Sequence, residues 1–187
     1  LNTALPSMAE ALGESPMKMQ SVIVAYALTT AMLIPATGWV ADRFGTRRVY
    51  GWAIGLFVLG SVLCALSPSL PFLIAARVVQ GVGGAMMLPV GRLAVLRTYP
   101  RGEFIRAMSF IAIPGQVGPL LGPTLGGWMV EYASWHWIFF INVPLGLAAI
   151  ILSLRIIPDI RETERRSFDL SGFITTSVAM VSLVTAM

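Results

Sequence analysis

Charged side chains are scarce in this sequence of 187 residues. Asp, Glu, Lys and Arg make up 12% of the chain, whereas a soluble domain contains about 25%. Hydrophobic residues make up 56% and run in long blocks along the whole length. This composition excludes a water-soluble globular protein. We expect an all-α, polytopic membrane protein whose main solvent is the lipid bilayer.

Cysteine and histidine are almost absent. Cys64 and His136 are the single residues of their kinds, which leaves no disulfide framework and no cluster of metal ligands. We therefore expect no metal site. His136 lies between Trp135 and Trp137, a setting that favours a membrane-interface residue over a proton relay.

Apolar blocks of about 20 residues predict membrane-spanning helices. Residues 1–6 are expected to be the outer tail of a preceding helix, and 7–19 a polar loop with a helix start at Ser15-Pro16. The chain opens without methionine and stops inside an apolar block, so we expect a fragment at both ends. Five complete spans are predicted at 20–41, 48–66, 70–95, 104–130 and 135–157, and a further one begins at Phe168.

The basic residues alternate between the two sides of the membrane. Eleven of the thirteen Lys and Arg residues lie in or near the loops at 42–48, 97–106 and 158–167, and Lys18 alone lies on the other side. This bias predicts that the three loops are cytoplasmic, in a multi-pass protein of the cell inner membrane. Because the arginines form short clusters between apolar blocks, the net charge of +4 does not indicate nucleic-acid binding.

The turn between the first two complete spans holds four charges within residues 38–48. Gly38 and Asp42 share a helix face one turn apart, and a glycine there lets another helix approach closely. Asp42 at the membrane edge can pair with Arg43 or Arg47, or accept from the N-terminus of a nearby helix. Making and breaking such contacts could bias inward-open against outward-open states. A topology marker without a switching role is the alternative.

Arg77 lies about two helical turns inside its span. An arginine in the bilayer is costly, and normally faces the helix bundle or a wet cavity. Gln80, Gly81 and Gly84 follow at intervals of three, four and seven residues, which predicts one narrow polar face. An arginine that snorkels to the outer surface is the alternative.

Glycines recur every four residues in the fourth complete span. Gly118, Gly122 and Gly126 predict a groove free of side chains. Pro119 and Pro123 each remove a helical N–H and crowd the carbonyl four residues back. We expect a bent helix whose smooth face packs tightly on a neighbour. A generic small-residue packing face predicts the glycines but not both prolines.

These three patterns resemble motifs of the major facilitator superfamily. G-x-x-x-D-R-x-G-x-R-R is similar to the loop after its second helix, R-x-x-Q-G-x-G-G-A to the fourth-helix motif of proton-coupled members, and G-x-x-x-G-P-x-x-G-G to the fifth-helix antiporter motif. The segments 2–6 and 135–144 resemble the fourteen-helix drug:proton antiporter (EmrB/QacA) family, in its MdtD-like branch. The resemblance implies the N-terminal half of that fold, from the end of helix 1 to the start of helix 7.

The resemblance also divides the chain and assigns roles to its residues. Residues 1–157 would form the N-terminal transmembrane bundle, and 158–187 a cytoplasmic linker with the start of helix 7. A conformational latch would comprise Gly38, Asp42, Arg43, Gly45, Arg47 and Arg48. Proton coupling would involve Arg77, Gln80, Gly81 and Gly84. The antiporter helix motif would comprise Gly118, Pro119, Gly122, Pro123, Gly126 and Gly127.

Polar residues within the spans are candidates for lining a substrate cavity, although such residues more often bond one helix to another. The five complete predicted spans contain no Asp or Glu, and the family's first-helix aspartate falls before residue 1. The proton-binding carboxylate is therefore expected outside this sequence. The candidates for the cavity are Tyr26, Thr30, Gln116 and Asn142.

The resemblance implies a proton-coupled exporter of small amphipathic compounds, working by alternating access. Such a transporter needs the proton gradient and no cofactor, and the resemblance implies no catalytic site and no enzyme activity. Its partners would be the bilayer, the substrate, protons and the C-terminal half of the same chain, without nucleic acid. Three alternatives stay open: an exporter of an organic acid or metal chelate, a facilitator uniporter or symporter, and an inert truncated fragment.

Overall fold

The computed structural model describes residues 2–100, 102–157 and 167–186, and every regular element in these ranges is a helix. The predicted all-α class is confirmed. Part of the predicted cytoplasmic loops lies outside the described residues, namely most of the linker and the basic residues Arg101, Arg161, Arg165 and Arg166. The elements are η1 (Asn2–Ala4), α1 (Leu5–Leu12), α2 (Pro16–Leu33), η2 (Ile34–Ala36), α3 (Thr37–Phe44), α4 (Thr46–Ala65), α5 (Leu70–Thr98), α6 (Phe104–Tyr132), α7 (Trp137–Phe140), α8 (Asn142–Ile156) and α9 (Leu170–Ala186).

Within the described residues, five helical stretches are long and apolar enough to cross a membrane, and they match the five predicted spans. The first consists of α2, η2 and α3 in succession, because Pro35 has no N–H to continue the α-helical ladder and the chain tightens into a 3₁₀ turn there. The shorter apolar helix α9 occupies the predicted start of a further span. The stretches are Pro16–Phe44, Thr46–Ala65, Leu70–Thr98, Phe104–Tyr132 and Trp137–Ile156.

The predicted loop at 7–19 is wrong over most of its length. Helix α1 ends at Leu12, and α2 already begins at Pro16. The sequence is polar there because α1 is amphipathic: Met8 and Ala9 are buried while Glu10 is exposed. The predicted helix start is confirmed, since the Ser15 hydroxyl accepts a hydrogen bond from the Lys18 N–H at 3.4 Å.

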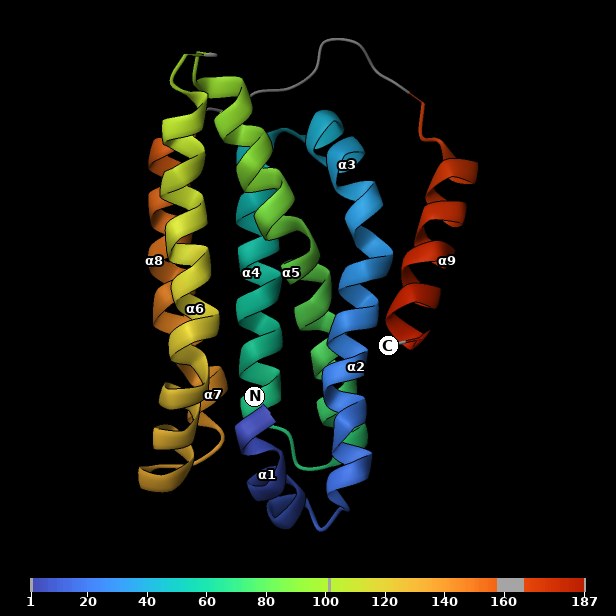
Figure 1. Ribbon diagram of the computed structural model, residues 1–187, viewed down its shortest axis with the longest axis vertical. Coiled ribbons are helices and arrows are strands. Elements are labelled where there is room, and N and C mark those ends of the chain that lie inside the picture. The colour runs from blue at the N-terminus through green and yellow to red at the C-terminus, as the bar shows by residue number, and fades with distance from the viewer. Residues whose placement is uncertain (1, 101, 158–166, 187) are drawn as a thin grey trace.

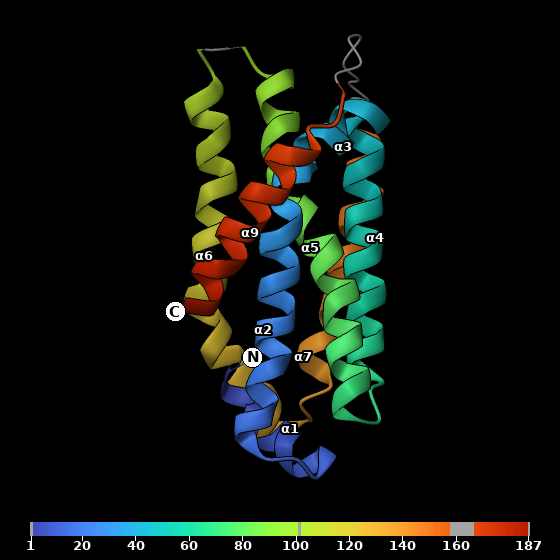
Figure 2. The same ribbon diagram turned by 90° about the vertical axis from the view of Figure 1, so that its right-hand side faces the viewer.

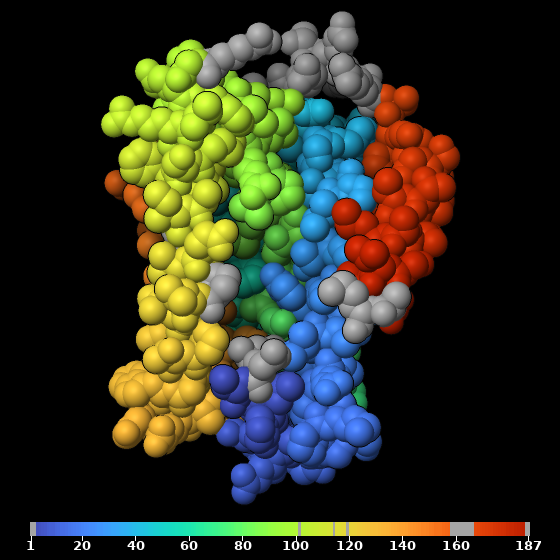
Figure 3. Space-filling view, in the orientation of Figure 1, coloured from blue at the N-terminus to red at the C-terminus, as the bar shows by residue number. Residues whose placement is uncertain are grey.

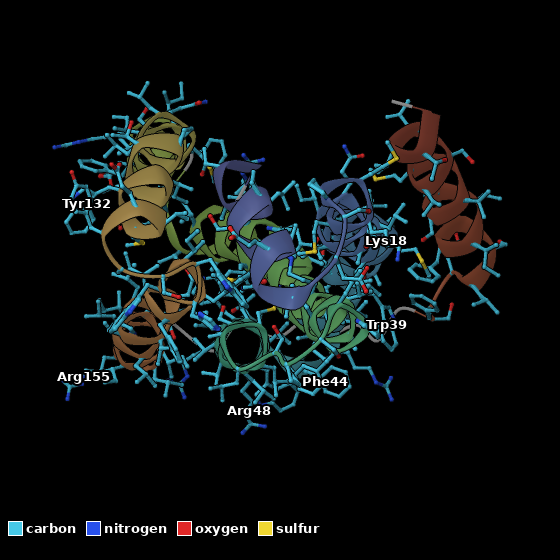
Figure 4. All side chains as sticks on the ribbon, turned by 90° about the horizontal axis from the view of Figure 1, so that it is seen from below. Lys18, Trp39, Phe44, Arg48, Tyr132 and Arg155 are labelled. Carbon is cyan, nitrogen blue, oxygen red and sulfur yellow. The ribbon has the colours of Figure 1, made fainter. Side chains whose placement is uncertain are left out.

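Helices α4 and α5 form the centre of the bundle (Figure 1). Helix α2 packs on α5 and α8 packs on α4, while α9 lies outside α2 (Figures 1 and 2). Viewed from below, α6 and α9 lie on opposite sides of the bundle (Figure 4). The α3–α4 turn and the α5–α6 connection lie at one end, at the top of Figure 1. We call this end, which carries Arg43, Arg97 and Arg155, the basic end.

The opposite end holds the larger hydrophobic core. It joins α1, the start of α2, the end of α4, the start of α5 and the α6–α7 region. Met8, Val22, Cys64 and Phe139 are almost fully buried in it. A second, small core around Ala41, Val49 and Val90 lies near the basic end. The polar residues considered next lie along the helices that connect these two cores.

Candidate functional site

Arg77 on α5 is buried inside the bundle, with 9% of its surface exposed. Its Nε donates to the Val22 carbonyl of α2 at 3.2 Å, and its Nη1 donates to Gln80 Oε1 at 2.5 Å. The guanidinium also lies over the Tyr26 ring, 4.2 Å from the ring centroid. The alternative of a snorkelling side chain does not describe this geometry, because three groups inside the bundle hold the charge.

The polar contacts of Arg77 continue across two more helices. Gln80 is 1% exposed and donates from Nε2 to the Ser61 hydroxyl of α4 at 2.6 Å. Asn142 on α8 donates from Nδ2 to the same hydroxyl at 3.3 Å. The result is a chain of hydrogen bonds, the Arg77 network, that links α2, α5, α4 and α8. Buried hydrogen bonds of this kind order the helices that contribute to them.

Sequence reasoning missed Ser61 in this network. It follows Gly60 in the apolar second half of α4, and this small, polar pair was the available signal. A Cβ atom at Gly60 would lie 2.5 Å from the Gln80 Cα. The glycine therefore lets α4 and α5 approach closely enough for Ser61 to reach the Gln80 amide.

The glycines of α5 have the same effect toward α2. A Cβ at Gly81 would lie 2.9 Å from the Thr29 Cβ, and one at Gly84 would lie 2.5 Å from the Tyr26 hydroxyl oxygen. A residue with a side chain at either position would force the neighbouring atoms of α2 to shift. The predicted narrow face of α5 is thus in place, and it seats Tyr26 beside Arg77.

A groove of about 670 Å³ runs between α2–α3 and α5, from this network toward the basic end. Its polar groups come from Tyr26, Thr30, Thr37 and Arg92, and its other lining residues are apolar or glycine. The Thr30 hydroxyl is buried and has no hydrogen-bond partner among the described residues. Figure 3 shows the bundle hollowed between α6 and α2. Of the predicted cavity residues, Tyr26 and Thr30 line the groove, Asn142 belongs to the Arg77 network and Gln116 is exposed on α6.

Asp42 at the end of α3 pairs with Arg97 on α5. Arg97 Nη2 lies 2.5 Å from Asp42 Oδ1, and the two side chains are 19% and 34% exposed. The predicted partners, Arg43 and Arg47, are therefore wrong. Arg43 instead points its guanidinium over the rings of Trp39 and Phe44, at 5.4 and 5.9 Å from their centroids.

The turn that carries Asp42 depends on a glycine. Gly45 closes α3 and opens α4 with φ at 92°, a conformation that residues with a side chain rarely adopt. Arg47 and Arg48 follow in the first turn of α4. Gly38 does not show the predicted close helix approach within the described residues, because nothing lies within 4 Å of a Cβ built there.

Helix α6 runs unbroken through both motif prolines. The predicted tight packing of its glycine face is wrong for the described residues: a Cβ at Gly118, Gly122 or Gly127 would meet nothing within 4 Å. Gly126 alone approaches another element, with Thr3 Oγ1 3.1 Å from its Cβ position. Most of this glycine face is therefore open among the described residues.

The single histidine lies at the end opposite the basic residues. Ser134 Oγ and His136 Nδ1 are 2.6 Å apart, and the imidazole stacks on the Trp135 ring at 3.7 Å between centroids. Burial lowers the pKa of His136. The described residues contain no group of three or more His, Cys, Asp or Glu side chains that could hold a metal ion.

Buried charge, close helix contacts and five apolar spans define a multi-pass membrane protein. The family model of the Major Facilitator Superfamily matches residues 1–185. The chain therefore belongs to the major facilitator superfamily, as the motif resemblance indicated.

Curated relatives narrow the resemblance further. The chain is similar to proteins named "Putative multidrug resistance protein MdtD": it is 58% identical to the one from Serratia proteamaculans, 56% to that from Escherichia fergusonii and 54% to that from Yersinia enterocolitica. Each match covers 100% of this chain but only 39% or 40% of the relative. The predicted MdtD-like resemblance is confirmed, and the chain spans about two fifths of the relatives' length.

Proposed function

We propose that this chain is the N-terminal part of a proton-coupled transporter that exports small amphipathic compounds by alternating access. The relatives' name, multidrug resistance protein, supports efflux as the direction of transport. The groove between α2–α3 and α5 would form one wall of the substrate path, and a C-terminal bundle would form the other. No enzyme activity is part of the proposal.

The observation that carries the proposal is the buried Arg77 network. A charge inside the bilayer is retained at a cost, and normally marks an ion or substrate path. Here it lies beside a groove and reaches α2 and α5 directly, and α4 and α8 through Gln80 and Ser61. A change of charge near Arg77, such as protonation of a carboxylate, would alter hydrogen bonds that connect all four helices. Proton coupling is therefore assigned to Arg77 and Gln80, with Gly81 and Gly84 seating α2.

Two further features support antiport with a moving second half. The open glycines of α6 leave a smooth surface on which another bundle could slide. The Asp42–Arg97 pair joins the basic turn to α5, and fits a latch whose state depends on how α3 is held. The excess of arginine at the basic end supports a cytoplasmic location for that end, in the inner membrane.

The test uses the full-length protein in everted membrane vesicles. Respiration acidifies the vesicle lumen, which a fluorescent pH probe reports. Adding ethidium should then release part of the pH gradient, because each imported cation exchanges for protons. Vesicles without the transporter are the control. If ethidium binds but leaves the gradient unchanged, a uniporter would replace the antiporter.

A second candidate is an exporter of organic acids or metal chelates. The observation that favours it is charge: the residues lining the groove include Arg92 and no carboxylate. Anionic compounds would be attracted to such a surface and cations repelled. An aromatic carboxylate that releases the pH gradient in the same vesicles, where ethidium does not, would decide for this candidate.

A further inference from the structure

The first membrane span is interrupted at Pro35, near the basic end. This break separates the groove residues of α2 from the Asp42–Arg97 pair at the end of α3. In an unbroken α-helix the Met32 carbonyl would accept from the N–H of Ala36. The Ile34 N–H still donates to the Thr30 carbonyl four residues back, but Pro35 has no N–H, and the Thr37 N–H donates only three residues back, to the Ile34 carbonyl. Beyond Ile34 the turn therefore lacks the regular α-helical bonds that would fix the angle between α2 and α3. Tyr26 and Thr30 lie before the break, while Asp42 lies after it.

Helix α9 supplies the missing donor. The Ser177 hydroxyl donates to the Met32 carbonyl at 2.8 Å, although the two residues are 145 positions apart. Ser177 is 5% exposed, while its neighbours on α9 are mostly exposed. This single buried hydroxyl thus ties the middle of α9 to the last turn of α2.

The start of α9 makes a second contact beyond the break. The Phe168 ring meets the Trp39 ring of α3 edge to face, with centroids 4.9 Å apart. Phe168 is itself held in place, since Asp169 caps α9 by accepting from the Gly172 N–H at 2.9 Å and Phe168 packs on Phe173 at 5.4 Å. A polar cap flanked by two packed apolar residues fixes the angle at which a chain enters a helix.

We propose that α9 is a splint across the break at Pro35, and that Ser177 and Phe168 are its two positioning residues. Ser177 holds α2 before the break and Phe168 holds α3 after it. A cavity of about 490 Å³ lies between α3 and the start of α9, and Gly38, Asp42 and Phe168 are among the residues that line it. The anchors therefore set the angle of α3 without filling the space beside it, and so fix where Asp42 meets Arg97.

Hydrogen exchange of the full-length protein in detergent tests the splint directly. Ser177→Ala should speed exchange of the amides at 37–44 about fivefold, the loss expected for one hydrogen bond. Ser177→Thr keeps the hydroxyl and should restore the slow rate. Ser182→Ala, on the exposed face of α9, is the matched control. Equal exchange in the Ser177→Ala and Ser182→Ala proteins, or no restoration by threonine, would overturn the proposal.

The second anchor has its own control. Phe168→Ala should also speed exchange at 37–44 about fivefold, whereas Phe110→Ala, which removes an exposed ring on α6, should not. If Phe168→Ala leaves that exchange slow, α3 is held by other contacts and the splint is wrong.

The consequence for transport rests on the proposed function and is measured separately. A splint that sets the position of α3 should affect switching and not substrate binding, so Ser177→Ala should lower the maximal efflux rate while KM stays the same. Faster hydrogen exchange with unchanged efflux would support the splint but contradict the latch role proposed for Asp42. Slower efflux with unchanged exchange would overturn the splint alone.

Discussion

The Asp42–Arg97 ion pair should act as one unit in transport by the full-length protein. At about 4 Å and an effective dielectric of 20, two unit charges attract by about 4 kcal/mol. The side chains keep 34% and 19% of their surface exposed, so solvent screening reduces this to about 1 kcal/mol. That energy is a factor of about five in an equilibrium constant. Asp42→Asn and Arg97→Gln should therefore each slow efflux about fivefold, without loss of membrane insertion.

A double-mutant cycle of ethidium efflux measures whether the pair is the contact that matters. The combined Asp42→Asn/Arg97→Gln protein should be no slower than either single variant, because the second change removes a partner already lost. Asp42→Asn with Arg43→Gln is the matched control, and its two effects should multiply, since Arg43 lies over Trp39 and Phe44. The reasoning is refuted if the Asp42 and Arg97 effects multiply as well.

Three further changes test the packing and the cap. Gly60→Leu would drive a side chain into the Gln80 backbone, so the Tm in detergent should fall by an amount equivalent to about 1–3 kcal/mol. The control Gly55→Leu, at an open position, should leave the Tm unchanged. Equal Tm values for the two variants would contradict the close α4–α5 contact. Gly122→Leu should leave the Tm unchanged, because its Cβ position is open, but should block pH-driven efflux if a second bundle covers α6; normal efflux would show that this face stays uncovered. Hydrogen bonds from the Gly172 N–H and the Ser171 hydroxyl hold the pKa of Asp169 below its ordinary value. The cap is thus complete above the ordinary carboxyl pKa and is lost as the pH falls through the lowered value, so exchange at Gly172, corrected for its intrinsic pH dependence, should speed up in acid for the wild type but not for Asp169→Asn.

The spans and the position of Arg77 could be predicted from the sequence because each depends on a local property. The length of an apolar block determines whether it can span the membrane. A charged residue seven positions inside such a span must be buried in protein or lie in a water-filled cavity. The intervals from Arg77 to Gln80, Gly81 and Gly84 follow from helical geometry alone, so their common face was also predictable.

The partner of Asp42 could not be predicted in the same way. Arg97 is 55 residues away, and which of several arginines at the basic end meets Asp42 depends on how α3 packs on α5. Ser61 was missed for the same reason, since its role appears only when α4 lies against Gln80. Helix α1 was missed because it is amphipathic and short, and its charged face resembles a loop when hydropathy alone is read.

The central claim is that the Arg77 network couples proton movement to export. The most direct measurement is ethidium uptake by proteoliposomes that hold the full-length protein, with the lumen made acidic. The wild type should accumulate ethidium against its gradient, and Arg77→Gln should only equilibrate it, while Arg106→Gln, an exposed arginine at the basic end, should behave as the wild type does. Accumulation by the Arg77→Gln protein equal to that of the wild type would contradict the account.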